Sequence, residues 1–173
     1  MTALYDIVIP TLTNILKAEQ DILAKGEAWA AEKGTPFSDL IEASLAPDMW
    51  NLSQQFTITA VHVTMFTAKI TGATPNTVPM GPASLADVKK YLAETIQTLE
   101  AIKPADINGK ENQILGAFLG AANPNAPMKA VDYVQGYLMP HVYFHTTTAY
   151  AILRSKGVPL EKGDFSGRMV KLA

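Results

Sequence analysis

The fold is decided by the last long helical stretch of the chain, DYVQGYLMPHVYFHTTTAYAILRSK, which covers residues 132–156. Gly157 and Pro159 follow this stretch and end the predicted helix. His141 and His145 are four residues apart, and residues with this spacing lie one above the other on the same face of a helix. The stretch therefore predicts a long helix that presents two imidazoles to one neighbour.

Three further long helices are predicted upstream of this stretch. Their apolar residues recur at helical spacing, and Gly or Pro follows each of them. We expect the first to end at Gly34, the second to run from an N-cap at Asp48 to Gly72, and the third to run from Ser84 to about Ile102. Four long helices without convincing alternating strands predict an all-α four-helix bundle that forms one domain, residues 1–173.

The segment before the last helix, residues 104–129, is the hardest to assign. Three Gly and three Pro residues prevent a long helix there. Residues 113–119 are either a strand of a small hairpin or part of an irregular flap. We expect residues 71–82 to form a loop, residues 38–43 a short helical piece, and residues 159–173 a tail.

Composition excludes several classes of function. The chain has no cysteine, so disulfides, thiolate metal sites and a cysteine nucleophile are excluded. The net charge of −2 and the absence of a basic stripe argue against binding to nucleic acid. No apolar run approaches the ~20 residues that span a bilayer, and the first residues do not resemble a signal peptide. We therefore expect a cytoplasmic protein without a membrane partner.

The third histidine of the chain, His62, lies near the middle of the second predicted helix. At 1.5 Å per residue it lies ~20 Å from the start of that helix, and the midpoint of His141 and His145 lies ~17 Å from the start of theirs. The three imidazoles are thus expected at similar depth. Three histidines with one open position are typical of a catalytic metal site, but a metal-free polar pocket fits the spacing equally well.

Other residues on these helical faces are candidates for the same pocket. Pro140 cannot donate a backbone N–H to Gly136, so we expect either a kink beside His141 that leaves room for a ligand or a simple curve of the helix around the core. Tyr137 lies one turn before His141. Thr59, Lys69 and Thr148 share the faces of the histidines, and Glu19 and Asp48 are candidate acceptors for a hydrogen bond from an imidazole. Most of the aromatic residues are assigned to the core by default and some of them to the lining of the pocket; they are Trp50, Phe56, Phe66, Tyr133, Tyr143, Phe144 and Tyr150.

Three motifs resemble a known family. They are LYDIVIP at residues 4–10, LAPDM at residues 45–49, and PHVYFHTTTAYAILR at residues 140–154 followed by GVPL at 157–160 and GDF at 163–165. Together they resemble domain-of-unknown-function family 1993, which is related to the DinB/YfiT-like four-helix bundles. The resemblance implies a divalent metal, such as Zn, Ni or Fe, held by one histidine of the second helix and an HxxxH pair of the fourth. His62, His141 and His145 match this layout, and related bundles include transferases and isomerases that use a small thiol.

Three functions follow as hypotheses. The first is a small-molecule enzyme, a transferase, isomerase or hydrolase, with His62, His141, His145 and Tyr137 in its catalytic site and a metal on the three histidines. The second is a metal-free isomerase or cyclase in which a histidine acts as acid or base and Tyr137 or Tyr143 orients the substrate. The third is a non-catalytic binding protein. We expect a homodimer, because four-helix bundles readily pair through an apolar helix face.

Overall fold

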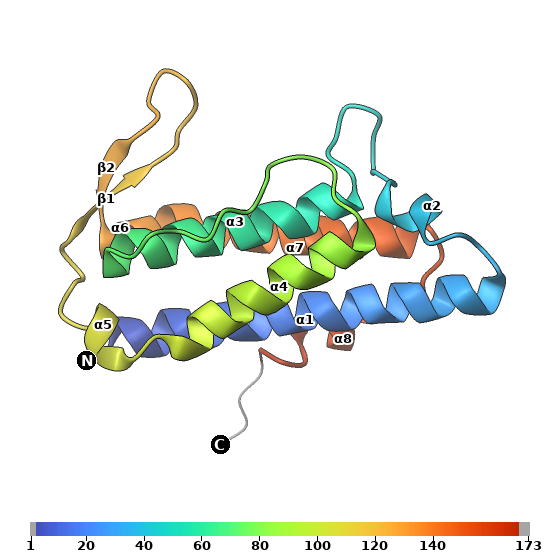
Figure 1. Ribbon diagram of the computed structural model, residues 1–173, viewed down its shortest axis with the longest axis horizontal. Helices are drawn as coiled ribbons and strands as arrows, with labels where there is room; N and C mark the ends of the chain where they lie inside the picture. Colours follow the sequence, from blue (N-terminus) through green and yellow to red (C-terminus); the bar gives the residue numbers. More distant parts are fainter. Residues whose placement is uncertain (1–2, 170–173) are drawn as a thin grey trace.

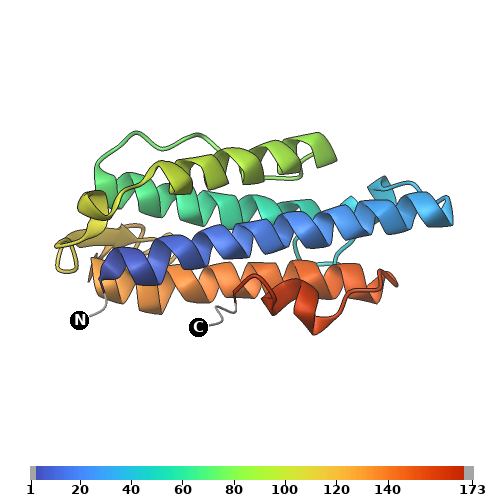
Figure 2. The same ribbon diagram turned by 90° about the horizontal axis from the view of Figure 1, so that it is seen from below.

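The computed structural model describes residues 3–169, and four of the helices in this range are long (Figure 1). They are α1 (Leu4–Lys33), α3 (Leu52–Thr71), α4 (Leu85–Ala101) and α7 (Met139–Ser155). Helix α3 packs against both α7 and α4, and α1 packs against α4. The four helices lie lengthwise beside one another in both views (Figures 1 and 2). The predicted all-α bundle is confirmed.

The short elements lie in the connections between the long helices, except for one that follows the last of them. They are α2 (Ser38–Ile41), α5 (Pro104–Ile107), β1 (Ile114–Ala117), β2 (Ala126–Lys129) and α8 (Lys162–Ser166). The two strands form an antiparallel hairpin in which Ile114 lies opposite Lys129. The hairpin interpretation of residues 113–119 is therefore correct.

The predicted tail is more ordered than expected, because it contains α8. The Asp164 side chain accepts a hydrogen bond from the Glu161 backbone N–H at 2.8 Å, which fixes the start of this short helix. Asp164 also pairs with Lys25 of α1 at 2.5 Å, and Arg168 pairs with Asp21 of α1. These ion pairs fasten the segment to the outside of α1. The last residues of the predicted tail, 170–173, lie outside the described residues.

Aliphatic side chains from all four long helices form the core. In α1, the residues whose spacing predicted the helix are all buried, namely Leu12, Ile15, Leu16, Ile22 and Leu23. Phe56 and Phe66 of α3 are also fully buried. Burial of these apolar surfaces supplies the main driving force for folding.

Helix α3 begins at Asn51 rather than at Asp48, so the predicted N-cap is wrong. The Asn51 side chain accepts from the Gln54 backbone N–H at 3.1 Å, and the Gln54 side chain accepts from the Asn51 N–H at 3.2 Å. This reciprocal capping box satisfies two N–H groups at the start of the helix. Asp48 is exposed in the preceding turn. The predicted cap of α4 is correct, because Ser84 accepts from the Asp87 N–H at 3.1 Å.

The last helical stretch contains a short π-helical segment. This helical stretch starts with α6 (Ala130–Tyr133), continues as the π segment η1 (Val134–Leu138) and passes into α7. Pro140 lies in the first turn of α7 and cannot donate to the carbonyl of Gly136. A π turn allows the backbone to skip that bond without ending the helix. The disruption predicted between Gly136 and Pro140 therefore takes the form of a widened turn.

Among residues 3–169, no helix is both long enough and apolar enough to cross a membrane.

Candidate functional site

The three histidines lie side by side where α3 packs against α7. His62 comes from α3, and His141 and His145 come from successive turns of α7. The ring centroid of His62 lies 4.7 Å from that of His141 and 6.0 Å from that of His145. The structure thus brings the three predicted site residues together, with His62 in contact with both of the others.

Hydrogen bonds orient both imidazoles of α7. Nδ1 of His141 lies 2.6 Å from the backbone carbonyl oxygen of Tyr137, and Nδ1 of His145 lies 2.7 Å from Oε1 of Gln55. Both oxygens accept, so in the neutral rings each Nδ1 carries the proton and donates it. The lone pair of each ring is therefore on Nε2, where it is available to a metal ion or to a substrate proton.

Two of the three histidine rings, those of His62 and His145, are neutral at neutral pH. Burial is the main cause that lowers the pKa of His62 to about 3, and the nearby His141, His145 and Lys69 contribute to the same shift. Burial also lowers the pKa of His145 to about 4, with His141 as a second cause. Neutral imidazole is the form that coordinates metals and accepts protons.

Tyr137 lies against two of the histidines. Its ring centroid is 4.3 Å from that of His141 and 5.6 Å from that of His62. The Tyr137 side chain carries a hydroxyl and is buried. Burial raises the pKa of this hydroxyl, so it keeps its proton at neutral pH and can donate it to a bound molecule. The chain thus places a proton donor beside the imidazoles.

Two aromatic residues that were assigned to the core by default instead cover His145. Trp50 stacks on the imidazole at 6.0 Å, and Phe144 meets it edge-on at 5.2 Å. Both side chains are largely at the surface, with 43% of Trp50 and 58% of Phe144 exposed. Tyr143 is exposed as well, at 39%. The core assignment of these three residues is wrong, because α7 turns this face toward solvent beside the loop that carries Trp50.

The predicted acceptors for the imidazoles lie elsewhere. Asp48 is exposed in the loop before α3. Glu19 is completely buried, but its Oε1 accepts a hydrogen bond from the Thr146 hydroxyl at 2.8 Å instead of one from an imidazole. The hydroxyls of Thr59 and Thr148 donate to carbonyls of their own helices.

Gln55 is the functional residue that the sequence analysis missed. It holds Nδ1 of His145 and lies seven residues before His62 on α3. Residues seven apart lie on nearly the same helix face. That spacing was the signal that would have placed Gln55 in the same row as His62.

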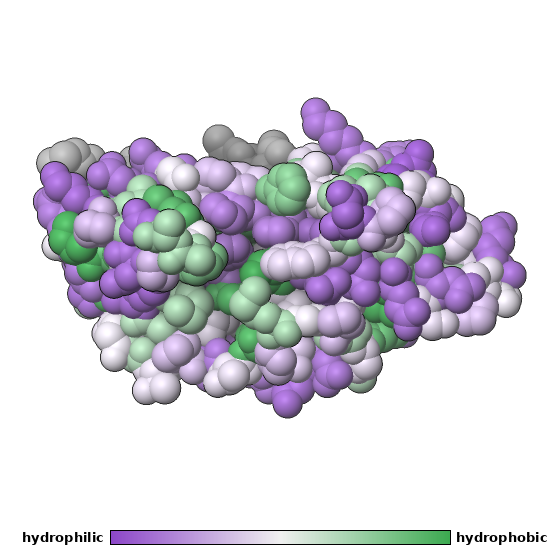
Figure 3. All heavy atoms as spheres, turned by 90° about the horizontal axis from the view of Figure 1, so that it is seen from above, coloured by the Kyte–Doolittle hydropathy of each residue, from purple (hydrophilic) through white to green (hydrophobic). Residues whose placement is uncertain are grey.

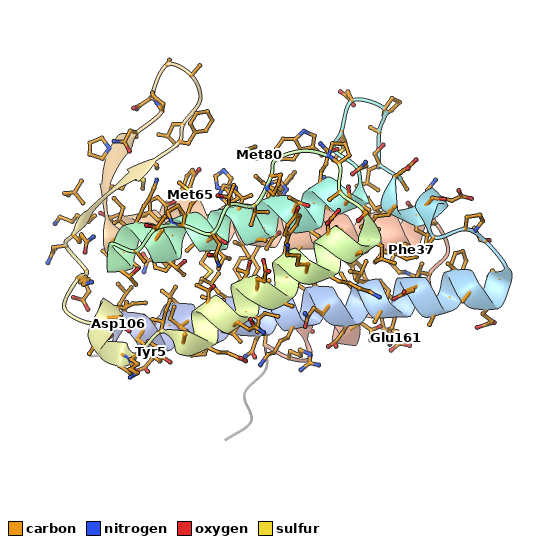
Figure 4. The ribbon with its side chains drawn as sticks, viewed as in Figure 1. Tyr5, Phe37, Met65, Met80, Asp106 and Glu161 are labelled. Carbon is orange, nitrogen blue, oxygen red and sulfur yellow. The ribbon has the colours of Figure 1, made fainter. Side chains whose placement is uncertain are left out.

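The histidine site lies beneath one face of the bundle. The hairpin β1–β2 and the loop between α2 and α3 project from the same side of the molecule (Figure 1). Met65 and Met80 lie between these two projections along α3 (Figure 4), and both side chains are exposed. On this face, apolar groups are interspersed with polar ones (Figure 3). A small molecule approaching the histidines would therefore meet a surface of mixed character.

Comparison with known proteins gives the family of this chain. A family model described as a domain of unknown function, DUF1993, matches residues 4–166. The chain belongs to this family. A crystal structure of a DinB family member from Shewanella denitrificans matches this DUF1993 protein with a TM-score of 0.87 and 28% identity, over 98% of this chain and 95% of that one. No curated protein matches the chain. The predicted family and the DinB-like fold are confirmed.

Proposed function

We propose that this DUF1993 protein is an enzyme that binds a divalent metal ion through His62, His141 and His145 and acts on a small molecule. The orientation of the two α7 imidazoles carries the proposal. Each is held through Nδ1 by a neutral oxygen, from Tyr137 or Gln55, which leaves Nε2 free. Metal-binding histidines are usually held in this way by a second oxygen acceptor.

The three histidines are suitable metal ligands by their chemistry, but their side chains are only partly arranged to hold an ion. Three neutral imidazoles favour Zn, Ni or Fe. Among residues 3–169, however, no three His, Cys, Asp or Glu side chains already stand in a geometry that would hold an ion. Binding would therefore require side-chain rotation of the histidines. When bound, the metal would supply a Lewis acid that polarises a substrate oxygen or activates a thiol, as in a transferase, isomerase or hydrolase.

The surrounding residues would bind and orient the substrate. The protonated Tyr137 hydroxyl would donate a hydrogen bond or a proton to a group beside His141. Trp50 and Phe144 shield His145 from water on two sides. A partly dry site strengthens every electrostatic interaction within it.

Metal analysis tests the proposal directly. The full chain is purified without chelators, its metal content is measured, and the metal-free protein is titrated with zinc and nickel by calorimetry. We expect about one ion per chain. His62→Ala, His141→Ala and His145→Ala should each weaken binding by tenfold or more, because each removes a ligand. Tyr137→Phe serves as the control, because it leaves all three imidazoles in place. A purified protein that is metal-free and binds neither ion would refute the proposal.

A metal-free isomerase or cyclase is the second candidate. The close contact of Tyr137 with His141, 4.3 Å between ring centroids, pairs a hydroxyl donor with an imidazole base. This enzyme would keep its activity in the presence of a chelator and lose it in His141→Ala or His145→Ala. Loss of activity on chelation, restored by zinc or nickel, would instead favour the metal enzyme.

A further inference from the structure

Lys69 lies at the hairpin end of the histidine site. It follows His62 by seven residues on α3, which is two turns or ~10 Å along the helix axis on nearly the same face. Its side chain is half-buried, and the ammonium donates a hydrogen bond to the backbone carbonyl of Gly116 in β1. The ammonium also lies 5.6 Å from the ring centroid of Tyr133.

No carboxylate of residues 3–169 pairs with this ammonium. The ion pairs among residues 3–169 join other side chains, and none includes Lys69. Both oxygens that hold the α7 histidines are neutral, because one is a backbone carbonyl and the other an amide oxygen. Glu19 is the only fully buried carboxyl in the described part of the chain, and burial raises its pKa to about 8, so it is uncharged at neutral pH.

Aromatic rings form a continuous row between Lys69 and the histidines. Tyr133 lies beneath the ammonium, its ring centroid is 4.9 Å from that of Tyr137, and Tyr137 is 4.3 Å from His141. A molecule that extends from the histidines to Lys69 would lie over this row, in which Tyr133 is fully buried and Tyr137 is 6% exposed. Such a row favours a carbon chain or a planar group in the middle of the molecule.

We infer that the substrate is a small organic acid, whose anionic group binds Lys69 while its reactive group lies at the three histidines. This inference rests on the proposed function. An ammonium has three N–H donors, and only the Gly116 carbonyl accepts from it among the described residues. A half-buried cation without a counterion is costly, and a carboxylate or phosphate of the ligand would relieve that cost with a charge-assisted hydrogen bond. A divalent metal at the histidines would add to the positive charge that attracts such a ligand.

The test compares two probes that differ only at one end. The full-length protein is loaded with cobalt, and binding of 6-mercaptohexanoate and of 6-mercaptohexanol is followed by the thiolate-to-cobalt absorption band. The thiol binds the metal in both, and only the first carries a carboxylate at the end of its chain. We expect the acid to bind roughly tenfold more tightly than the alcohol, the size of one charge-assisted hydrogen bond.

Three variants assign this preference to a residue. Lys69→Met should reduce the ratio of the two affinities to about one, and Lys69→Arg should keep most of it. Lys110→Met is the matched control, because Lys110 is also half-buried and donates to a backbone carbonyl, that of Ile70 at 2.9 Å. Loosening of the hairpin would weaken both probes alike and leave the ratio unchanged. No preference in the unaltered protein, a preference that survives Lys69→Met, or one that is lost in Lys110→Met would overturn the inference.

The two proposals fail in different ways. If cobalt does not bind, the metal proposal fails, and the same pair of probes is then compared on metal-free protein by calorimetry. A preference for the acid that depends on Lys69 would still support the anion site. If cobalt binds and the two thiol probes bind to it with equal affinity, the metal proposal stands and the proposed substrate class is wrong.

Discussion

Glu19 shows at the scale of one residue how burial sets a protonation state. Its side chain has no exposed surface, and Oε2 has no hydrogen-bond partner among the described residues. Burial raises its pKa from 4.5 to about 8, and the hydrogen bond from Thr146 reduces this rise. The carboxyl therefore stays protonated inside the bundle at neutral pH, while it would be ionised in the unfolded chain.

Glu19→Gln should remove one pH dependence of stability. Between pH 4.5 and about 8 the folded protein holds a proton on Glu19 that the unfolded chain has released. The contribution of Glu19 to the free energy of unfolding is therefore greatest below pH 4.5. This contribution falls by up to several kcal/mol as the pH rises to about 8. The neutral amide has no such proton to lose. Relative to the unaltered protein, Glu19→Gln should gain stability from pH 5 to pH 8.5 in urea denaturation.

The control for this measurement is Glu32→Gln. Glu32 lies on the same helix with 74% of its side chain exposed. Replacing the Glu32 carboxylate by an amide should change the free energy of unfolding by less than about 1 kcal/mol at every pH. A parallel pH profile for Glu19→Gln and the unaltered protein would show that Glu19 is ionised in the folded state.

The sequence predicted which histidines meet, but not what holds them. Helical spacing and depth along the helix depend only on residue number, so they placed His62 near His141 and His145 correctly. The partner of His145 is Gln55, whose role depends on the side-chain direction across two helices. The exposure of Trp50 and Phe144 depends on the path of the neighbouring loop. The periodicity of apolar residues in the sequence does not predict that path.

At the scale of one element, the start of α3 depends on a reciprocal pair. Asn51→Ala should lower the free energy of unfolding by about 1 kcal/mol, because it leaves the Gln54 N–H without its acceptor. Asp48→Ala is the matched control and should have little effect, since Asp48 is exposed outside the helix. Thermal unfolding of both variants measures the difference. An effect of Asp48→Ala as large as that of Asn51→Ala would contradict the observed cap.

The elements themselves were more predictable than their ends. Long apolar periodicity fixed the four helices, because each must bury one face. The cap of α3 was misplaced because Asp48 and Asn51 are both good cap residues before the same apolar run. The turn that closes between the Met49 N–H and the Ala46 carbonyl, at 3.0 Å, keeps Asp48 outside the helix. Pro47 occupies the second position of this turn, where proline is favoured, so the local sequence also supports the turn.

At the scale of the whole molecule, Gly26 sets how closely the first and last long helices approach. A Cβ atom built on Gly26 would lie 2.9 Å from Cδ2 of the fully buried Leu153 in α7. Gly26→Val should therefore lower the free energy of unfolding by about 1–3 kcal/mol through overpacking. Ala24→Val, on an exposed position of the same helix, should cost less than about 1 kcal/mol. Equal losses in urea denaturation would mean that Leu153 moves aside without cost.

The predicted homodimer stays a proposal of the sequence analysis. Phe118 and Leu119 beside the end of β1 are more than half exposed, as is Phe144 of α7. Apolar side chains at these positions are compatible with a partner but do not identify one.

The π segment has a consequence for the angular alignment of the site. Tyr133, Tyr137, His141 and His145 are spaced by four residues, and on a regular α-helix each such step rotates about 40° past a full turn. Three steps would rotate Tyr133 about 120° away from His145. A π turn takes more residues, so η1 (Val134–Leu138) turns the helix back and offsets this drift. The wide turn thus acts as a phase correction that keeps tyrosines and histidines in one row.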